Sequence, residues 1–298
     1  MCSRLCFLIV VLISLLSPAS IVGQAQERRV TVAVLGFGDS RIGRLASETL
    51  DANLKSVPEL FILDRDQASS AAKGAGHIAS LNMSLQEARG LGAAIGSDYY
   101  IVGDAQTLRR SPSVGPLYFE SYASIFLVSS RTGRLLIWQR PSFRAATAVA
   151  AEKLLVDDLS SDATRRRNLV AIRQAQEGER MRRGMAIESS VPLLEAAPDD
   201  DTTAPAEGLR LPRPFRRLSP PYPETAAIAE VEATVDVLVD LDNKGEVSNA
   251  EVARWAGFGL DEATIETVRR LQFFPAMRNG IPIPLRVLLR YNFRKPPK

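Results

Sequence analysis

The sequence predicts an α+β protein: a mixed α/β layer domain, a linker, and a small domain with the element order ββαβ. Three observations predict this fold class. Strand and helix patterns alternate from residue 29 to about 160, which is typical of α/β layers. Residues 188–218 are rich in proline and aspartate and have little apolar surface to bury. From residue 219 onward, stretches of two-residue apolar alternation surround one helical stretch.

The N-terminal domain, expected over 29–160, should begin with a buried strand at 29–35 and a helix capped by Ser40. Ser84 and Glu87 have the spacing of a capping box, which predicts the start of a later helix. Further strands are predicted at 60–64, 99–103, 121–128 and 135–138.

A charged helix is predicted at 161–187, between this domain and the linker. It contains Arg165-Arg166-Arg167 and a second basic run from Arg180 to Arg183. A solvated helix face and a contact with anionic lipid both fit this charge.

Residues 1–25 are predicted to be a signal peptide or an N-terminal membrane anchor. Arg4 precedes an apolar run of about a dozen residues, as in a secretory signal. Gly23-Gln24-Ala25 offers small residues to a signal peptidase, so cleavage before Gln26 is the first prediction. The alternative is an uncleaved anchor, since the apolar stretch extends to Val22, although serines and a proline interrupt the span of about 20 apolar residues that a membrane needs.

The residue inventory argues against an enzyme. Both cysteines, Cys2 and Cys6, lie in the N-terminal segment, so its removal excludes disulfides, thiolate catalysis and zinc–cysteine sites. The single histidine, His77, has no Cys or His partner for metal binding or catalysis. Gly36-Phe37-Gly38 has Arg41 where a dinucleotide fingerprint needs a third glycine. We therefore predict no catalytic residue, no cofactor and no metal.

Nucleic acid is not predicted as a partner. The formal net charge of +3 is small for 298 residues, and no stripe of lysine and arginine interleaved with aromatic residues is evident.

The C-terminal domain, expected over 219–294, begins with apolar alternation from Val231 to Val239. A tight turn at 242–245 should lead into a second strand at 246–254. A helix is predicted behind Gly259, and a last strand is predicted over 285–293.

This ordered set of residues resembles the C-terminal domain of TonB-type energy transducers. The matching positions are Tyr222-Pro223, the valine run, Asp242 with Gly245 and Val247, Gly259-Leu260-Asp261 with Ala263, Val268, Phe273 with Pro275-Ala276, Asn279-Gly280 with Pro282, and Phe293. The resemblance covers about a quarter of the chain. Ala233 stands where the family usually has glycine and Leu271 where it usually has tryptophan; both are expected in the core, so these departures concern core packing rather than the fold.

The N-terminal domain has a second, looser resemblance over residues of about 30–160. Ile95-Gly96-Ser97-Asp98-Tyr99, with Ile101-Val102-Gly103 and Arg131-Thr132-Gly133, resembles the fold shared by CsgG-like, FlgO-like and TolB N-terminal envelope domains. This resemblance implies an envelope protein with a binding role.

The TonB resemblance implies a partner-binding site at the last strand, where a short peptide of an outer-membrane receptor or transporter adds beside the sheet. Arg286, Arg290 and Asn292 are expected on the outward face of that strand with Leu288, where the arginines both guard a free edge and favour an acidic partner. Tyr222 and Pro223 are expected to fix how the linker meets the sheet, or simply to cap the start of the strand.

Two functions follow as hypotheses for a protein of the periplasm or cell envelope. The first is receptor binding by strand addition in TonB-linked transmembrane transport. The alternative is a non-energised structural or adaptor module in envelope or secretion assembly. Inner-membrane or other envelope proteins, and a second copy of the chain, are further candidate partners.

Overall fold

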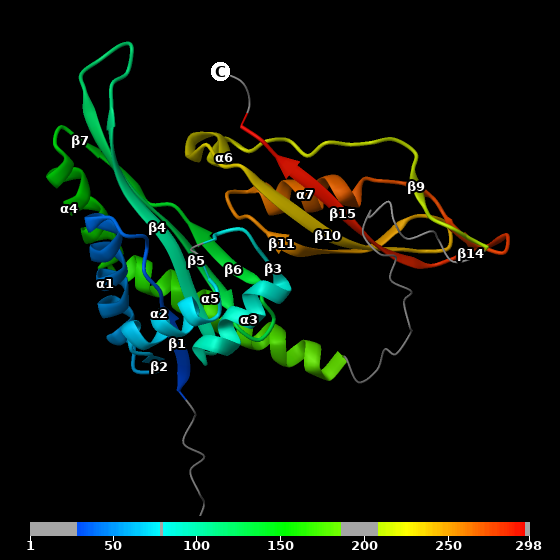
Figure 1. The fold of residues 1–298 in the computed structure, drawn as a ribbon, viewed down its shortest axis with the longest axis horizontal. Helices are drawn as coiled ribbons and strands as arrows, with labels where there is room; N and C mark the ends of the chain where they lie inside the picture. Colours follow the sequence, from blue (N-terminus) through cyan, green and yellow to red (C-terminus); the bar gives the residue numbers. More distant parts are fainter. Residues whose placement is uncertain (1–28, 78–79, 186–207, 296–298) are drawn as a thin grey trace, which may run out of the picture.

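The computed structural model describes residues 29–77, 80–185 and 208–295 (Figure 1). Helices alternate with strands in the first part and strands dominate the last part, so the predicted α+β class is confirmed. The predicted signal peptide or anchor and most of the predicted linker lie outside the described residues. Within the described ranges, no helix is long and apolar enough to cross a bilayer.

The N-terminal half is built on a six-stranded sheet with the strand order β2-β1-β4-β5-β6, and β7 lies beside β5. Its strands are β1 (Val30–Val34), β2 (Leu60–Ile62), β4 (Tyr99–Arg110), β5 (Tyr118–Ser129), β6 (Leu135–Gln139) and β7 (Ser142–Ala145). β1 runs parallel to β2 and β4, whereas the pairs that β5 makes are antiparallel. The tip of the long β4–β5 hairpin projects beyond the neighbouring elements (Figure 1).

One face of this sheet packs against α1 (Arg41–Lys55), α4 (Ala148–Leu159) and α5 (Asp162–Met185). The Ser40 hydroxyl accepts a hydrogen bond from the Gly43 N–H at 2.9 Å and so caps α1, as the sequence predicts. The basic start of α5 is paired internally: Arg165 pairs with Asp162, and Arg167 lies 3.7 Å from Asp158.

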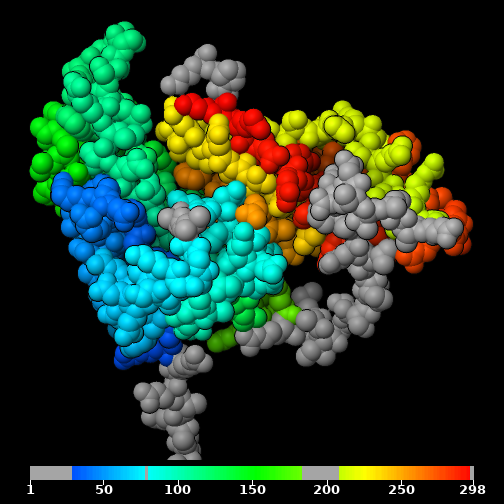
Figure 2. Space-filling view, viewed as in Figure 1, coloured from blue at the N-terminus to red at the C-terminus, as the bar shows by residue number. Residues whose placement is uncertain are grey.

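The opposite face of the sheet is covered by α2 (Arg65–Gly74), α3 (Leu85–Ile95) and the C-terminal half of the chain. Neighbouring residues alternate between the two cores: Tyr100 and Val102 contribute to this one, and Tyr99 and Ile101 to the other. Because both faces are buried, the central strands form near-continuous apolar runs. The two halves share this second core and lie directly against each other in the space-filling view (Figure 2).

The C-terminal half contains a four-stranded antiparallel sheet with the order β15-β10-β11-β3. Its strands are β10 (Ala233–Leu241), β11 (Val247–Trp255), β15 (Leu285–Phe293) and β3 (Met83–Ser84), the last of which belongs to the N-terminal half. α6 (Glu224–Ala229) precedes β10, and α7 (Leu260–Arg269) packs on one face. The sequence predicts the hairpin, helix and last strand of this domain but not the strand contributed by β3.

Residues 208–214 differ from the expectation of a linker. β8 (Leu209–Arg210) pairs with β13 (Ala276–Arg278), which also pairs with β14 (Ile281–Ile283). β9 (Arg213–Pro214) pairs with β12 (Phe273–Phe274). These short strands form in a proline-rich stretch because proline is tolerated in edge strands, where the backbone groups of the neighbouring residues can still pair.

Candidate functional site

The strand β15 lies at an edge of the C-terminal sheet. It pairs with β10 along its whole length, from Leu285 opposite Leu241 to Phe293 opposite Ala233. No other described strand pairs with it. An edge of nine residues therefore has a side along which an extended chain could add.

Four of the predicted site residues lie on one face of this strand. Arg286, Leu288, Arg290 and Asn292 stand opposite Asp240, Leu238, Asp236 and Thr234 of β10. The intervening positions pack into the core with the face that carries α7. The predicted outward orientation of this set agrees with the strand register.

The two arginines are held by carboxylates of the neighbouring strand. Arg286 donates from Nε and Nη2 to the Asp240 carboxylate at 2.5 and 2.9 Å. Arg290 donates in the same way to Asp236 at 2.7 and 3.1 Å. The pKa of Asp240 is lowered, mainly because Arg286 donates hydrogen bonds to its carboxylate. The arginines are thus pre-oriented by bidentate pairs rather than left as free positive charges.

The two pairs differ in burial, which decides what a partner can reach. The side chain of Asp236 is 7% exposed, whereas that of Arg290 is 56% exposed. An acidic group on a bound peptide could therefore approach Arg290 without displacing Asp236. Asn292 is exposed and its Oδ1 accepts from the Thr234 hydroxyl at 2.8 Å.

Tyr222 and Pro223 lie at the start of α6, close to one end of β15. The Tyr222 hydroxyl donates to the Val231 carbonyl at 2.6 Å, and its ring centroid is 6.3 Å from that of Phe293. Pro223 is the residue before α6, and its ring faces Gly259. These contacts fasten the chain that leads into β10 against the sheet.

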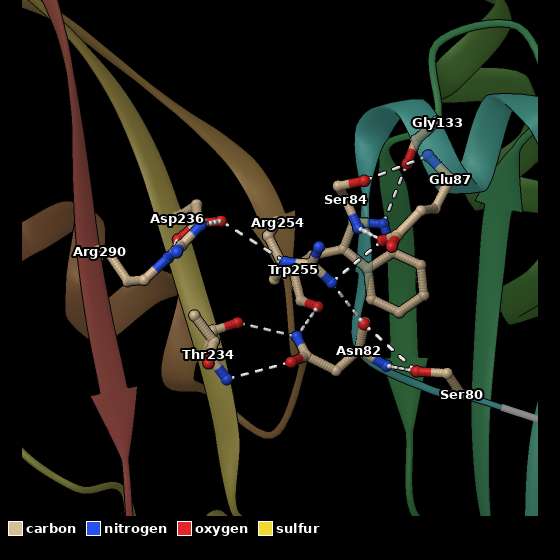
Figure 3. A network of polar contacts seen from close by, with 10 residues as sticks. All are labelled: Ser80, Asn82, Ser84, Glu87, Gly133, Thr234, Asp236, Arg254, Trp255 and Arg290. Carbon is tan, nitrogen blue, oxygen red and sulfur yellow. Dashed lines mark hydrogen bonds and ion pairs between the residues drawn. The ribbon is translucent and has the colours of Figure 1, made fainter. Parts of the chain in front are cut away.

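The other edge of the sheet is paired with the N-terminal half at the C-terminal end of β11. Met83 and Ser84 pair with Trp255 and Arg254 of β11. Beside this short pairing, Asn82 makes three hydrogen bonds to the sheet (Figure 3). Its Nδ2 donates to the carbonyls of Thr234 and Trp255 at 2.8 and 2.7 Å, and its Oδ1 accepts from the Thr234 N–H at 3.1 Å.

A row of charges connects the two edges. Asp236 faces Arg290 on β15 and lies 3.5 Å from Nε of Arg254 on β11. Arg254 also forms an ion pair with Glu87 of α3, in which Nη1 lies 3.0 Å from Oε2 (Figure 3). The Ser84 N–H donates to Oε2 of Glu87, and this hydrogen bond is the main reason why the pKa of the Glu87 carboxyl is lowered. The network thus extends from the open edge to the N-terminal half.

An aromatic cluster joins the halves beneath this network. Trp255 is 1% exposed and stacks on Phe126 of β5 with ring centroids 5.8 Å apart. Phe258 packs edge-on against Phe126 and lies 5.4 Å from the Trp138 ring. The Trp255 Nε1 donates to the Gly133 carbonyl at 3.0 Å. Gly133 has φ +72°, and a Cβ there would overlap the Leu85 carbonyl oxygen, so this turn needs glycine.

A groove of about 1280 Å³ lies between β6 and β11 and extends along α7. Asp261 lines it, and burial raises the pKa of this carboxyl to about 7. The N–H groups of Ala256 and Gly257 donate to its two oxygens at 2.9 Å each and act against that rise. Asp261 thereby fixes the loop that carries Phe258 to the N-terminal half.

The sequence gives no signal for the residues that join the halves. Asn82 lies in a short connection before a helix, and Trp255 lies at the end of a strand with no evident partner. His77 is half-buried, and burial lowers its pKa. Within the described residues, no group of three or more His, Cys, Asp or Glu side chains could hold a metal ion.

Comparison with known families identifies the C-terminal domain. Residues 219–294 match the model of the Gram-negative bacterial TonB protein C-terminal family. The chain therefore carries a TonB-like C-terminal domain. Domains of this family are non-catalytic, belong to envelope proteins and generally interact with outer-membrane receptors. The comparison with curated proteins gave no match.

Several solved structures with some similarity each cover part of the chain. The Pseudomonas aeruginosa TonB C-terminal domain is 19% identical, and the match covers 29% of this chain and 89% of that one with a TM-score of 0.26. The Neisseria meningitidis lipoprotein GNA1162 is 16% identical, with 47% and 99% covered and a TM-score of 0.33. The hypothetical protein CT253 of Chlamydia trachomatis is 10% identical, with 48% and 95% covered and a TM-score of 0.31. At these TM-scores none of them determines the fold or the function of this chain.

Proposed function

We propose that this protein binds a peptide segment of an outer-membrane receptor or transporter by strand addition to β15, as part of TonB-linked transport. The TonB-like C-terminal domain supports the class of partner. The observation that carries the proposal is the edge position of β15, which has β10 on one side and no described strand on the other.

The proposed recognition has a backbone part and a side-chain part. An extended peptide would complete the hydrogen-bond ladder along 285–293, which requires no particular peptide sequence. Arg286 and Arg290 would favour a peptide with acidic residues at alternate positions, since side chains on one face of a strand recur every second residue. Leu288 lies between them and offers an apolar contact.

We propose for the N-terminal half a binding role like that of CsgG-like, FlgO-like and TolB N-terminal envelope domains. The proposed domain division is 29–160 for this half, 161–187 for the charged helix, and 219–294 for the TonB-like domain. Residues 1–25 would export the protein to the periplasm, either as a cleaved signal or as a retained anchor.

A second candidate function is an adaptor in envelope or secretion assembly that works without energy coupling. The observation that favours it is the attachment of the TonB-like sheet to the N-terminal half by β3 and Asn82. A sheet attached in this way does not need a long tether to function, and both halves could bind partners at a fixed spacing.

Peptide binding separates the two candidates. Fluorescence anisotropy would measure the affinity of the whole chain for labelled peptides from the plug region of TonB-dependent outer-membrane receptors. We expect saturable binding, and loss of that binding for the same peptides with alternate backbone amides N-methylated, because N-methylation removes ladder donors and keeps the side chains. Absence of binding at high micromolar peptide would favour the adaptor.

A pair of variants tests whether the peptide binds at β15. Arg290→Ala removes the exposed arginine of the edge and should weaken binding of an acidic peptide about tenfold, which corresponds to the lower end of the range for one hydrogen bond to a charged group. Arg89→Ala removes an exposed arginine of α3 and should leave affinity unchanged. Equal affinity of both variants for the acidic peptide would place the site elsewhere.

A further inference from the structure

The end of the molecule farthest from the N-terminal sheet is built from the short strands β8, β9, β12, β13 and β14 (Figure 1). These strands form two small sheets beside the main one. Large apolar residues and arginines are exposed on these strands and the residues beside them. These side chains belong neither to the strand-addition site nor to the contact between the halves.

Large apolar side chains are exposed at this end. Phe215 and Phe274 are 55% and 60% exposed, and their rings meet edge to face with centroids 4.3 Å apart. Ile281 is 66% exposed and Leu211 is 41% exposed. Single exposed apolar residues are common on soluble proteins, but a group of them marks an interaction surface.

Positive charge is concentrated at the same end. Residues 208–217 and 272–283 contain five arginines and no carboxylate, in a chain whose formal net charge is +3. The arginines are Arg210, Arg213, Arg216, Arg217 and Arg278, and all five are exposed. None of them forms an ion pair with another residue that the structure describes. They differ in this respect from Arg165 and Arg167 of α5, which are paired with carboxylates.

The strand register places the two kinds of side chain together. Arg213 stands opposite Phe274, so both lie on the solvent face of their pair, while Phe273 on the other face is buried. Arg278 stands opposite Ile281 in the β13–β14 hairpin. Apolar side chains are therefore flanked directly by guanidinium groups.

We propose that this end docks on the surface of a bilayer that contains anionic phospholipids. Phe215, Phe274 and Ile281 would enter the boundary between headgroups and acyl chains, where aromatic side chains are favourable. The arginines would contact phosphate groups bidentately while their stems lie along the apolar layer. Anionic lipid attracts such basic clusters electrostatically.

A nucleic acid is the other class of polyanion that could match the charge. The exposed aliphatic side chains favour the bilayer, because a duplex offers almost no apolar surface for Leu211 and Ile281 to bury against. A single strand could stack on Phe215, so the test includes nucleic acid explicitly.

Co-sedimentation with vesicles tests the proposal. The probes are vesicles of phosphatidylethanolamine with phosphatidylglycerol, and vesicles of phosphatidylcholine alone. The chain is measured both whole and starting at Gln26, so that any binding by the apolar N-terminal residues is separated from the rest. We expect binding to the anionic vesicles at least tenfold stronger than to the zwitterionic ones, and weaker binding as salt increases.

Two variants separate charge from apolar contact. Arg216→Gln with Arg217→Gln should weaken binding to anionic vesicles tenfold or more, at about fivefold per arginine near the surface. Phe215→Ser with Phe274→Ser should also weaken it about tenfold but leave the salt dependence unchanged, because these side chains contribute burial rather than charge. Thermal denaturation of each variant confirms that the fold is retained.

The matched control carries the same loss of two charges elsewhere. Arg166→Gln with Arg180→Gln changes two exposed arginines of α5, the helix for which the sequence leaves a lipid contact open. This control should bind vesicles like the parent chain. Equal binding to both vesicle types, loss of binding in the control instead, or binding to a DNA oligonucleotide without binding to vesicles would overturn the proposal.

Discussion

The two edges of the C-terminal sheet contrast with each other. The edge at β11 is covered at its C-terminal end, at Arg254 and Trp255, by β3 and Asn82 of the N-terminal half, and Trp255 is buried in an aromatic cluster. The edge at β15 carries the half-buried Arg286 and the exposed Arg290, which pair with aspartates of β10. At Arg254 and Trp255, the two β11 residues that pair with β3, the edge is paired within the chain, whereas no described strand pairs with the outer side of β15 at any position. Removal of contacts should therefore cost stability at the first edge and binding at the second.

The largest effect is expected for Trp255→Ala at the covered edge. The change removes a fully buried aromatic side chain that contacts Phe126 and the Gly133 carbonyl. Equilibrium urea denaturation should show a loss of about 3–5 kcal/mol in the free energy of unfolding. Phe274→Ala removes an aromatic side chain that is 60% exposed and should cost well under half as much. Equal losses for the two variants would contradict the contrast in burial.

Asn82→Ala should have the next largest effect. It leaves the N–H and carbonyl of Thr234 and the carbonyl of Trp255 without the Asn82 partner. Unsatisfied buried groups cost about 1–3 kcal/mol each, so we expect a loss of about 2–3 kcal/mol in urea denaturation after partial hydration. Asn249→Ala on the exposed side of β11 is the matched control and should cost under about 0.5 kcal/mol.

The pH dependence of stability should come partly from Asp261. Burial raises the pKa of this carboxyl to about 7, above its unfolded value of about 4. A raised pKa means that the protonated form is favoured in the folded state, so the contribution is complete below pH of about 4 and is lost as the pH rises toward 7. The free energy of unfolding should therefore fall by about 2 kcal/mol between pH 5 and 8.

Asp261→Asn removes this titration and should flatten the decline between pH 5 and 8. The variant also replaces one acceptor oxygen with an amide NH2 group, which can change its stability at every pH. The free energy of unfolding of the variant at higher pH is therefore compared with its own value at pH 5. A parent protein whose stability increases over this interval would contradict the pKa shift.

The smallest stability effect is expected for Arg290→Ala at the open edge. Its side chain is 56% exposed, and exposed ion pairs contribute about 0.2–1 kcal/mol. Asp236 would retain Arg254 at 3.5 Å. The same variant should weaken the binding of an acidic peptide in anisotropy measurements, so that loss of affinity exceeds loss of stability. A loss above about 2 kcal/mol would mean that this residue is structural.

Local patterns were sufficient to predict most elements of the fold. Ser40 caps α1, and Ser84 with Glu87 forms the capping box of α3, because these signals depend on residues three positions apart. The alternation in β10 and β15 predicts the sheet, and the register agrees with the outward placement of Arg286 and Arg290.

Contacts between distant segments could not be predicted in this way. Asn82 and Thr234 are 152 residues apart, and neither stretch has a periodic pattern that indicates the other. Asp236 and Asp240 alternate with valines like any solvated position, so their pairing with the arginines of β15 has no local signal. The proline content of 208–214 predicts a linker, although β8 pairs with β13 and β9 pairs with β12. Composition alone does not indicate which backbone groups form hydrogen bonds.

Hydrogen exchange of the whole chain, with and without a bound receptor peptide, tests the central claim most directly. We predict that Arg254 and Trp255 of β11 are protected in the free protein and do not change, while amides of 285–293 gain protection when the peptide binds. Added protection along the groove between β6 and β11, or none along β15, would contradict the assignment of β15 as the partner-binding edge.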